Sequence, residues 1–287
     1  MTIESLEYLT AKNLTEAWNQ AFSDYSITNQ KTEAALFRLL QRRGYDPSLS
    51  FGGFDGKRLA GFLLNGRGEW LGKPTAYDTG TGTLPEYRGQ RIAGRLLEAS
   101  LIKTREQGLS QYLLEVLTEN TKAARIYQKA GFNTCRTLEY YFGKPASIEK
   151  TKIPCGFSLQ VVAGLHWENI ESMWDFIPSW QNNRQSIERD RTSFLFLEAR
   201  MGESLAGYGI VEPLTGDVPQ IAVHPDYRRQ GIGSQLLLRI SQESKTGSLR
   251  VINADAANFG FRLWMKALGM LPAGQQYEMI AVLESAS

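Results

Sequence analysis

The chain has 287 residues, among them 32 lysines and arginines, 30 aspartates and glutamates and two histidines. The formal charge of +2 provides no basic field that would attract nucleic acid or an anionic membrane surface, so we expect neither as a partner. With 42% hydrophobic and 22% charged residues, the composition is that of an ordinary globular protein. The length suits two domains better than one.

Cysteine and histidine are too few for several kinds of site. Cys135 and Cys155 have no metal-type spacing, so we expect neither a disulfide framework nor a metal. His166 and His224 form no recognisable pair, which argues against a triad built on histidine. The N-terminal segment lacks the basic start and apolar run of a signal peptide, and no stretch of 18 apolar residues follows. We therefore expect a cytoplasmic protein.

The first half of the chain begins with helical patterns and continues with strands. Apolar residues at helical spacing alternate here with turn-bounded runs of strand-forming residues. The expected elements are helices over 11–23 and 32–43, two short strands between 51 and 64 joined by a turn at 55–57, a strand over 76–84, and a helix bearing Leu96, Leu97 and Leu101. A further strand and helix close this half.

The second half repeats the same order. The expected elements are helices over 166–176 and 184–190, two strands between 194 and 211 around a turn at 201–203, a strand over 218–223, and a helix bearing Leu236, Leu237 and Ile240. This order predicts a mixed α/β fold in which each half has a central mixed sheet flanked by helices.

Matching sequence blocks indicate that the two halves arose by duplication. LPEYRGQRIAGRLL at 84–97 matches HPDYRRQGIGSQLL at 224–237 almost position by position. Two further pairs, 59–62 with 205–208 and 129–132 with 267–270, occur in the same order at nearly the same offset. Coincidence of turn sequences explains three matched blocks poorly, so a tandem repeat is the better interpretation. We expect domains at 1–147 and 156–287.

The repeated block places a glycine-containing loop between a strand and the start of a helix. There, backbone N–H groups have no helical acceptor, and the helix dipole favours an anion. Gly231 and Gly233 leave the backbone open to close approach by a phosphate group. A plain strand-to-helix turn without a ligand is the alternative. The loop is neither a P-loop nor the dinucleotide fingerprint, because the glycine spacing differs and no Gly-Lys-Ser/Thr follows.

With these features the chain resembles the GNAT superfamily, the Gcn5-related N-acetyltransferases, whose CoA-binding motif reads Gln/Arg-x-x-Gly-x-Gly/Ala after a strand. The match is complete from Arg228 to Gly233, and from Arg88 to Ala93 it fails only at Arg91, which replaces a glycine. Arg91 either blocks the backbone approach or adds a guanidinium contact to a pyrophosphate. The resemblance covers nearly the whole chain twice and implies acetyl-CoA as acyl donor, with no metal.

The resemblance also implies which residues contact CoA. In the first half these are Thr81, Gly82, Thr83, Arg88, Gly89, Gln90, Arg91, Ile92, Ala93, Gly94 and Asn120. In the second half they are Ile221, Ala222, Val223, Arg229, Gln230, Gly231, Ile232, Gly233 and Ser234.

A second family block supplies the expected acid and base. Glu115, Asn120, Tyr127 and the pair at 131–132 reproduce its spacing. By resemblance, Glu115 is the general base for the amine, directly or through water, and Tyr127 protonates the departing thiolate. Each residue also has a structural interpretation: Tyr127 as core packing, Glu115 as a solvated or ion-paired carboxylate, and Asn120 as a helix cap.

The second half lacks that acid and base. The repeat aligns Glu115 with Asn253 and Tyr127 with Met265, and neither replacement can transfer a proton. We therefore expect the chemistry in the first half. The second half either binds CoA without turnover or completes the architecture, although Asp255 leaves other catalysis there open.

The acceptor is the least defined part of the prediction. In this family the first two helices and the facing sheet usually build the acceptor site, which here points to Asp24 and Tyr25, with Trp70 and Tyr77 as further candidates. A small-molecule or peptide amine is the expected acceptor, and the protein is expected to be a monomer or homodimer. The alternative function is a non-catalytic acyl-CoA-binding sensor or regulatory module.

Overall fold

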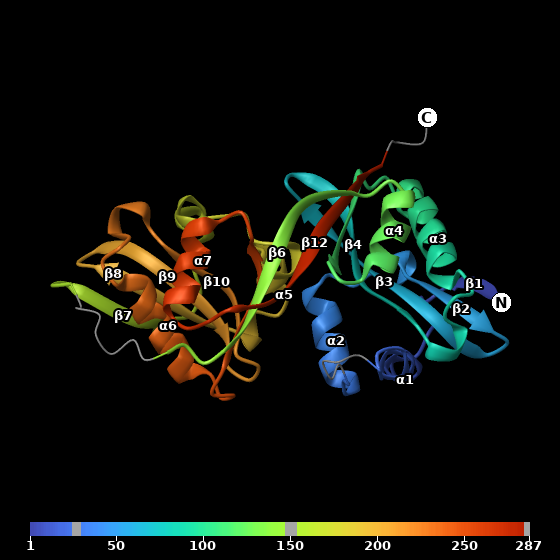
Figure 1. Ribbon diagram of the computed structural model, residues 1–287, viewed down its shortest axis with the longest axis horizontal. Helices are drawn as coiled ribbons and strands as arrows, with labels where there is room; N and C mark the ends of the chain where they lie inside the picture. The colour runs from blue at the N-terminus through green and yellow to red at the C-terminus, as the bar shows by residue number, and fades with distance from the viewer. Residues whose placement is uncertain (25–29, 147–153, 284–287) are drawn as a thin grey trace. The chain divides into compact units, whose positions relative to one another are not determined.

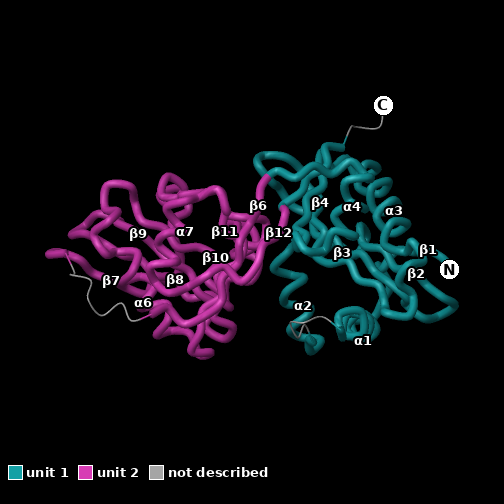
Figure 2. Tube along the Cα trace, viewed as in Figure 1, with its two compact units in different colours: residues 1–135, 278–287 teal, residues 136–277 magenta. Residues whose placement is uncertain are grey.

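The computed structural model describes residues 1–24, 30–146 and 154–283 and divides the chain into two compact units (Figures 1 and 2). Unit 1 contains residues 1–135 and the residues from 278 onward, and unit 2 contains residues 136–277. Both are built from a mixed sheet with helices, which confirms the predicted α/β fold class. The ranges 1–147 and 156–287 remain our proposal for the two duplicated domains.

The elements of unit 1 follow the predicted order closely. They are β1 (Thr2–Ser5), α1 (Ala11–Ala21), α2 (Glu33–Arg42), β2 (Phe51–Asp55), β3 (Arg58–Trp70), β4 (Lys73–Thr83), α3 (Ile92–Glu106), β5 (Gln111–Leu117) and α4 (Thr121–Lys129). Thr10 and Thr32 start the first two helices, because their hydroxyl oxygens accept the N–H groups of residues 13 and 35.

The remaining elements complete unit 2 and lead back to unit 1. They are β6 (Asn133–Gly143), β7 (Phe157–Val162), α5 (Arg184–Arg189), β8 (Leu195–Met201), β9 (Ser204–Glu212), β10 (Asp217–Val223), α6 (Ile232–Glu243), β11 (Leu249–Asp255), α7 (Phe259–Ala267) and β12 (Pro272–Val282). Among the helices in the described ranges, none has the length and apolar character needed to cross a bilayer.

The helix expected over 166–176 does not form as an α-helix. The segment instead makes two short 3₁₀ turns, Trp167–Asn169 and Glu171–Met173. Its buried side chains are Trp167, Ile170 and Met173, which recur every three residues. That spacing matches the three residues per turn of a 3₁₀ helix, in which residues three apart lie on one line, better than the 3.6 of an α-helix.

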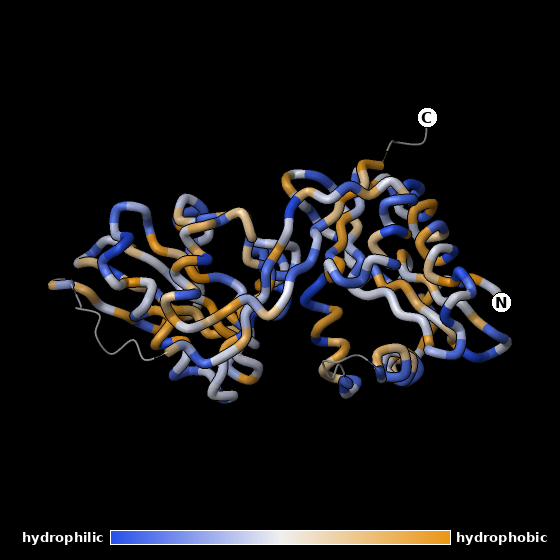
Figure 3. The backbone as a smooth tube through the Cα atoms, in the orientation of Figure 1, coloured by the Kyte–Doolittle hydropathy of each residue, from blue (hydrophilic) through white to orange (hydrophobic). Residues whose placement is uncertain are grey.

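Helices cover both faces of the sheet in unit 1. On β3, the Phe62 ring packs against Trp18 of α1 with ring centroids 5.8 Å apart. A Cβ added to the neighbouring Gly61 would instead lie 3.0 Å from Ile92 of α3. Because adjacent strand residues point to opposite faces, α1 and α3 lie on opposite sides of the sheet. Figure 3 shows hydrophobic stretches along these strands and helices, separated by hydrophilic turns.

Each unit is completed by a strand from the other half of the sequence. In unit 1, β12 lies beside β5, and the N–H of Leu283 donates to the carbonyl of Ser110 at 2.9 Å. In unit 2, β6 pairs antiparallel with β11, from Leu249 opposite Gly143 to Asp255 opposite Leu138. In Figure 2 the unit colour accordingly changes within both β6 and β12. Neither half of the sequence therefore contains all the strands of one unit.

This exchange predicts that the first half cannot fold alone. A fragment of residues 1–147 lacks β12 and the residue after it, which bring the buried side chains of Met279 and Leu283 into unit 1. Burying such side chains stabilises a fold by about 1.5–3 kcal/mol each, against a total stability of roughly 5–15 kcal/mol. In urea titrations followed by circular dichroism, we expect the fragment to show no cooperative unfolding transition.

The matched control restores the missing strand. A chain of residues 1–143 joined through a short glycine-containing turn to residues 272–283 has both β6 and β12 available to unit 1. It is expected to unfold cooperatively. Equal cooperativity of the 1–147 fragment and the joined chain would contradict the dependence on the exchanged strand.

Candidate active site

The predicted site residues of unit 1 lie where β4 and β5 stop pairing. These parallel strands pair over Thr75–Tyr77 and Gln111–Leu113, and within the described chain the paired stretch ends there. Both strands continue beyond this stretch, where their backbone groups no longer pair with each other and a ligand can bind between them. A register shift in the pairing of β4 with β3 lies at the same level, with Leu64 opposite Gly80 and Asn65 opposite Asp78. The shift is a β-bulge, a feature common beside active sites.

The two candidate CoA loops have the same backbone form despite their different residues. In unit 1, Gly89 and Arg91 have positive φ values of 80° and 60°; in unit 2, Arg229 and Gly231 have 62° and 86°. Arg91 therefore adopts the left-handed conformation of the glycine it replaces, at a cost of roughly 1–2 kcal/mol. Each loop leads directly into a helix, α3 or α6. Left-handed residues in such a turn orient N–H groups toward an anion, so both loops fit a pyrophosphate.

Open space beside the unit 1 loop agrees with that fit. A Cβ built on Gly89 or Gly94 would meet no heavy atom within 4 Å. Gly82, also predicted to contact CoA, has a packing reason to be glycine, because a Cβ there would lie 2.5 Å from the Phe62 ring. In unit 2, a Cβ on Gly233 would make ordinary contact with Trp264 at 3.4 Å. Gly89 in the loop and Gly94 in the first turn of α3 thus face open space on the side of the expected ligand.

The first arginine of each loop makes the same set of contacts. Arg88 donates to Asp24 at 2.5 and 2.9 Å and to the carbonyl of Ala21 at 2.9 Å. Arg228 pairs with Asp175 at 3.0 Å and donates to the carbonyl of Met173 at 3.2 Å. Both arginines also donate to the last residue of the preceding strand. These guanidinium groups therefore tie the loop to the region after the first helical segment of each copy.

This arrangement bears on the predicted acceptor residues. Asp24 is engaged by Arg88, and that hydrogen bond lowers the pKa of the Asp24 carboxyl below its ordinary value. If Asp24 is the counter-charge for an amine, the amine has to share the carboxylate with Arg88. Tyr25 lies outside the described residues. Tyr77, in contrast, is buried, and its hydroxyl donates to Glu115.

The predicted acid, Tyr127, is bonded to a carboxylate that the family motifs do not contain. Its hydroxyl donates to Oδ2 of Asp78 at 3.0 Å, and both residues are buried. The same Oδ2 accepts the Thr81 hydroxyl at 2.7 Å, while Oδ1 accepts the Gly80 N–H at 2.9 Å. Tyr127 from α4, Glu115 from β5 and Asp78 from β4 thus lie around the end of the paired stretch.

Burial dominates the titration of this cluster. It raises the pKa of the Asp78 carboxyl, although the hydrogen bonds from Thr81 and Tyr127 and the charge of Arg43 act in the opposite direction. Burial, followed by the charge of Asp78, holds the pKa of Tyr127 well above its ordinary value of 10.0. Tyr127 is therefore a neutral phenol at physiological pH and has a proton to give.

Asn120 caps α4, as its structural interpretation predicted. Its side-chain oxygen accepts the N–H of Ala123 at 3.2 Å. The matching Asn258 caps α7 by accepting the N–H of Phe261 at 2.8 Å, and its amide donates to the carbonyl of Asp175. The capping role is shared by both copies, while a contact from Asn120 to CoA remains a proposal.

Unit 2 has apolar or amide side chains at each corresponding position. Met265, which is fully buried, stands in place of Tyr127, and Asn253 stands in place of Glu115 and donates to the hydroxyl of Ser179 at 2.8 Å. The matched pairs Gly61–Thr83 and Gly207–Val223 fix the strand register, so Val218 occupies the place of Asp78. The proton-transfer groups of unit 1 are thus absent together at these three positions.

Unit 2 also fills the space between its two diverging strands. The amide of Asn182 donates to the carbonyl of Ile252 on β11, and its own carbonyl accepts the amide of Gln220 on β10. Tyr208 and Trp174 continue this chain of hydrogen bonds. The cavity that these residues line measures about 30 Å³. One water molecule needs roughly 10–15 Å³ of such space, so an acyl group with its CoA arm does not fit without rearrangement.

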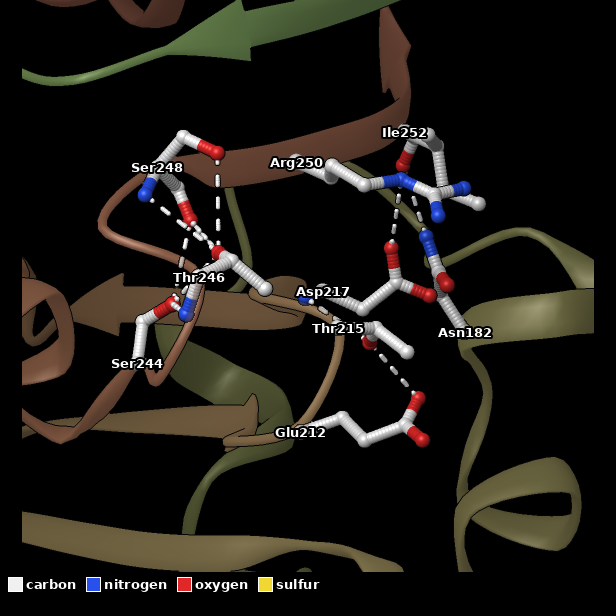
Figure 4. A network of polar contacts seen from close by, with 9 residues as sticks. All are labelled: Asn182, Glu212, Thr215, Asp217, Ser244, Thr246, Ser248, Arg250 and Ile252. Atoms are coloured by element: carbon white, nitrogen blue, oxygen red, sulfur yellow. Dashed lines mark hydrogen bonds and ion pairs between the residues drawn. The ribbon is translucent and has the colours of Figure 1, made fainter. Parts of the chain in front are cut away.

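A wider polar network holds this end of unit 2 together (Figure 4). Arg250 on β11 pairs with Asp217 on β10 at 3.2 Å, at the point where the two strands are in register. The bond from Asn182 to Ile252 lies beside this ion pair in the same view. Asn182 is therefore fixed where it bridges the strands.

Comparison with known proteins identifies the family of both copies. Residues 9–132 match the Acetyltransferase (GNAT) family, and residues 190–263 match the Acetyltransferase (GNAT) domain. Together these matches cover more than half of the chain. The chain belongs to the GNAT acetyltransferase family and is a tandem protein with two GNAT domains.

Named relatives are also acetyltransferases, although each is matched over part of its length. The mycothiol acetyltransferase of Thermobispora bispora is 32% identical over 124 residues, which are 41% of this chain and 42% of that protein. The N-alpha-acetyltransferase 30 of Schizosaccharomyces pombe is 30% identical over 97 residues, or 33% of this chain and 65% of that protein. The matches thus span less than two thirds of either relative.

Solved structures share the fold over the full chain. A tandem GNAT protein from the clavulanic acid biosynthesis pathway aligns with a TM-score of 0.72 at 16% identity, covering 100% of both chains. A GCN5-related N-acetyltransferase from Sphaerobacter thermophilus aligns with a TM-score of 0.73 at 15% identity, covering 100% of this chain and 96% of the other. At these identities the likeness concerns the fold.

The buried carboxyl of Asp78 predicts a distinctive pH dependence of stability. Its folded pKa lies above its unfolded value, so its stabilising contribution is present at low pH and is lost as pH rises through the folded pKa. Measured as urea unfolding between pH 4 and 8, the stability of the wild type relative to Asp78→Asn should fall with increasing pH.

Asp24→Asn is the control with the opposite sign. The pKa of Asp24 is lowered, so its contribution is present above the unfolded pKa and is lost as pH falls through the folded value. The stability of the wild type relative to Asp24→Asn should therefore decrease only below the ordinary pKa of 3.8, so both titrations are extended to about pH 2. Equal slopes for the two variants would contradict the burial of Asp78.

Proposed function

We propose that unit 1 transfers an acetyl group from acetyl-CoA to a primary amine by direct attack. The observation that carries the proposal is the position of two bonded pairs, Tyr127 with Asp78 and Glu115 with Tyr77, at the end of the β4–β5 pairing, together with the absence of Tyr127, Glu115 and Asp78 from unit 2. The loop from Arg88 to Gly94 would hold the pyrophosphate, and residues 81–83 would lie along the CoA arm.

The chemistry assigns one task to Glu115 and one to Tyr127. The amine nitrogen attacks the thioester carbonyl carbon, the C–N bond forms and the C–S bond breaks. Glu115 takes a proton from the nitrogen, and its carboxylate is held in place by the Tyr77 hydroxyl. Tyr127 gives its proton to the departing sulfur. The proton gained by Glu115 then passes to solvent.

The acceptor class rests on the family and on the relatives. One relative is named for mycothiol, a small molecule, and the other for the α-amino position. The near-neutral net charge of this chain favours neither a polyanion nor a strongly basic tail as acceptor. We therefore propose a small-molecule or peptide amine, acetylated in the cytoplasm, where the free thiols of Cys135 and Cys155 would persist.

Unit 2 has a separate role in this proposal. Its filled cavity and its three replaced positions argue against turnover there, while its loop keeps the anion-binding form. A regulatory acyl-CoA site confined to unit 2 is the second candidate function. A wild-type protein that binds acetyl-CoA but transfers no acetyl group to any amine would favour this regulatory function.

Replacing the acid should separate catalysis from binding. In Tyr127→Phe the proton donor is lost while the ring and its packing against Phe132 remain. We expect kcat for acetyl transfer to a panel of amines to fall by about 10²–10⁴-fold. The affinity for acetyl-CoA, measured by calorimetry, should stay within about threefold, because the loop contacts are unchanged.

Met265→Leu is the matched control at the same place in unit 2. It conserves volume and removes no proton donor, so kcat should stay close to that of the wild type. A Tyr127→Phe enzyme with full activity would contradict the assignment of the acid. A larger loss from Met265→Leu than from Tyr127→Phe would move the chemistry to unit 2.

A further inference from the structure

The buried carboxylate of Asp78 has no role in the reaction described so far. Burying an ionised carboxylate costs several kcal/mol unless it is well paired. Three donors reach it, from Gly80, Thr81 and Tyr127, and Arg43 lies near enough to lower its pKa. One of these donors is the proposed general acid itself. The buried carboxylate is therefore stabilised in part by the proposed catalytic acid, Tyr127.

The internal duplication links Asp78 to the acid. In unit 2, where Met265 replaces the tyrosine, Val218 replaces the aspartate and is fully buried. The bulge in the strand is kept, since the register of β10 with β9 also shifts between Asp217 and Gln220. The fold of the strand therefore does not require a carboxylate at this position. The carboxylate is present in the copy that has the tyrosine.

Electrostatics limits how Tyr127 can release its proton. A phenolate would lie 3.0 Å from the Asp78 oxygen, if that carboxyl were ionised. Two like charges at this separation repel strongly, because little solvent screens them in a buried site. Tyr127 can therefore give up its proton readily only when Asp78 carries one. The hydrogen bond between Asp78 and Tyr127 provides the path along which the proton of Asp78 passes to Tyr127.

We propose that Asp78 is a positioning residue that acts through Tyr127, holding its hydroxyl and returning a proton to it as the departing sulfur is protonated. The balance is simple. An acceptor that arrives as an ammonium loses two protons on becoming an amide. Glu115 takes these two protons in turn and releases them to solvent. Sulfur receives one proton from Tyr127, Tyr127 receives one from Asp78, and Asp78 regains one from solvent before the next turnover, so one proton is released overall. This inference rests on the proposed function of unit 1.

The surroundings of the pair favour this role. The titratable and charged groups around it are Arg43, which follows α2, Tyr77 on β4 and Tyr112 on β5. Tyr112 is occupied elsewhere, because its hydroxyl donates to Asn65 at 2.5 Å. Glu115 is held by Tyr77. Asp78 is thus the carboxylate bonded to Tyr127, and its burial lets it hold a proton.

A double-mutant cycle tests the proposal. Asp78→Asn can still accept a hydrogen bond from Tyr127 but cannot return a proton. We expect its kcat to fall by about 10²-fold or more with KM for acetyl-CoA within about threefold. In the Tyr127→Phe background, Asp78→Asn should cause no further loss of kcat, because both groups act on one proton. A kcat for Asp78→Asn within about threefold of the wild type, or losses that multiply in the double variant, would overturn the proposal.

A second measurement does not depend on activity. With tyrosine labelled with ¹³C at the ring carbon bearing the hydroxyl, the ionisation of Tyr127 can be followed by NMR and assigned by its absence in Tyr127→Phe. Asp78→Asn removes the neighbouring negative charge, so the pKa of Tyr127 should fall. An unchanged Tyr127 titration would overturn the pairing of the two groups. A wild type without acetyl transfer but with this shift would overturn the proposed function and its proton relay, while leaving the pairing intact.

Discussion

An unpaired edge of a strand exposes backbone groups that need hydrogen-bond partners, and this constraint organises the whole chain. The edge of β5 is covered by β12, and β6 lies against β11, so each unit draws a strand from the opposite half. A duplicated domain with this exchange cannot lose one copy without exposing an edge in the other. The first unit therefore needs the strand β12 from the second half of the sequence in order to fold, whether or not the second unit catalyses a reaction.

The two copies retain their architecture and differ in their chemistry. Both loops keep two left-handed residues, with glycine and arginine in exchanged places, and both keep an arginine bonded to an aspartate. Unit 2 has lost the acid and base, and Asn182 bridges its two strands. The retained features are those that position the loop and the sheet. The lost features are those that would move protons, so the duplication itself separates scaffold from active site.

The sequence predicted the fold class, the repeat and the family, because matched blocks and loop glycines are local signals. It could not predict the strand exchange, since nothing in β6 or β12 tells which half supplies the pairing partner. It placed an α-helix where Trp167, Ile170 and Met173 form 3₁₀ turns, because a short apolar pattern fits both periods. Asp78 was missed, as its bond to Tyr127 joins residues far apart in the chain; a carboxylate within a buried strand was the available signal.

Calorimetric titration of the full chain with acetyl-CoA tests whether unit 1 binds the acyl donor and unit 2 does not. Because Gly89 in the loop of unit 1 faces open space and the cavity of unit 2 measures about 30 Å³, we expect one acetyl-CoA per chain, followed by acetyl transfer when an amine acceptor is added. A stoichiometry of two would contradict the closed state of unit 2. Absence of binding at millimolar acetyl-CoA, in protein shown to be folded, would contradict the assignment of unit 1 as an acetyltransferase site.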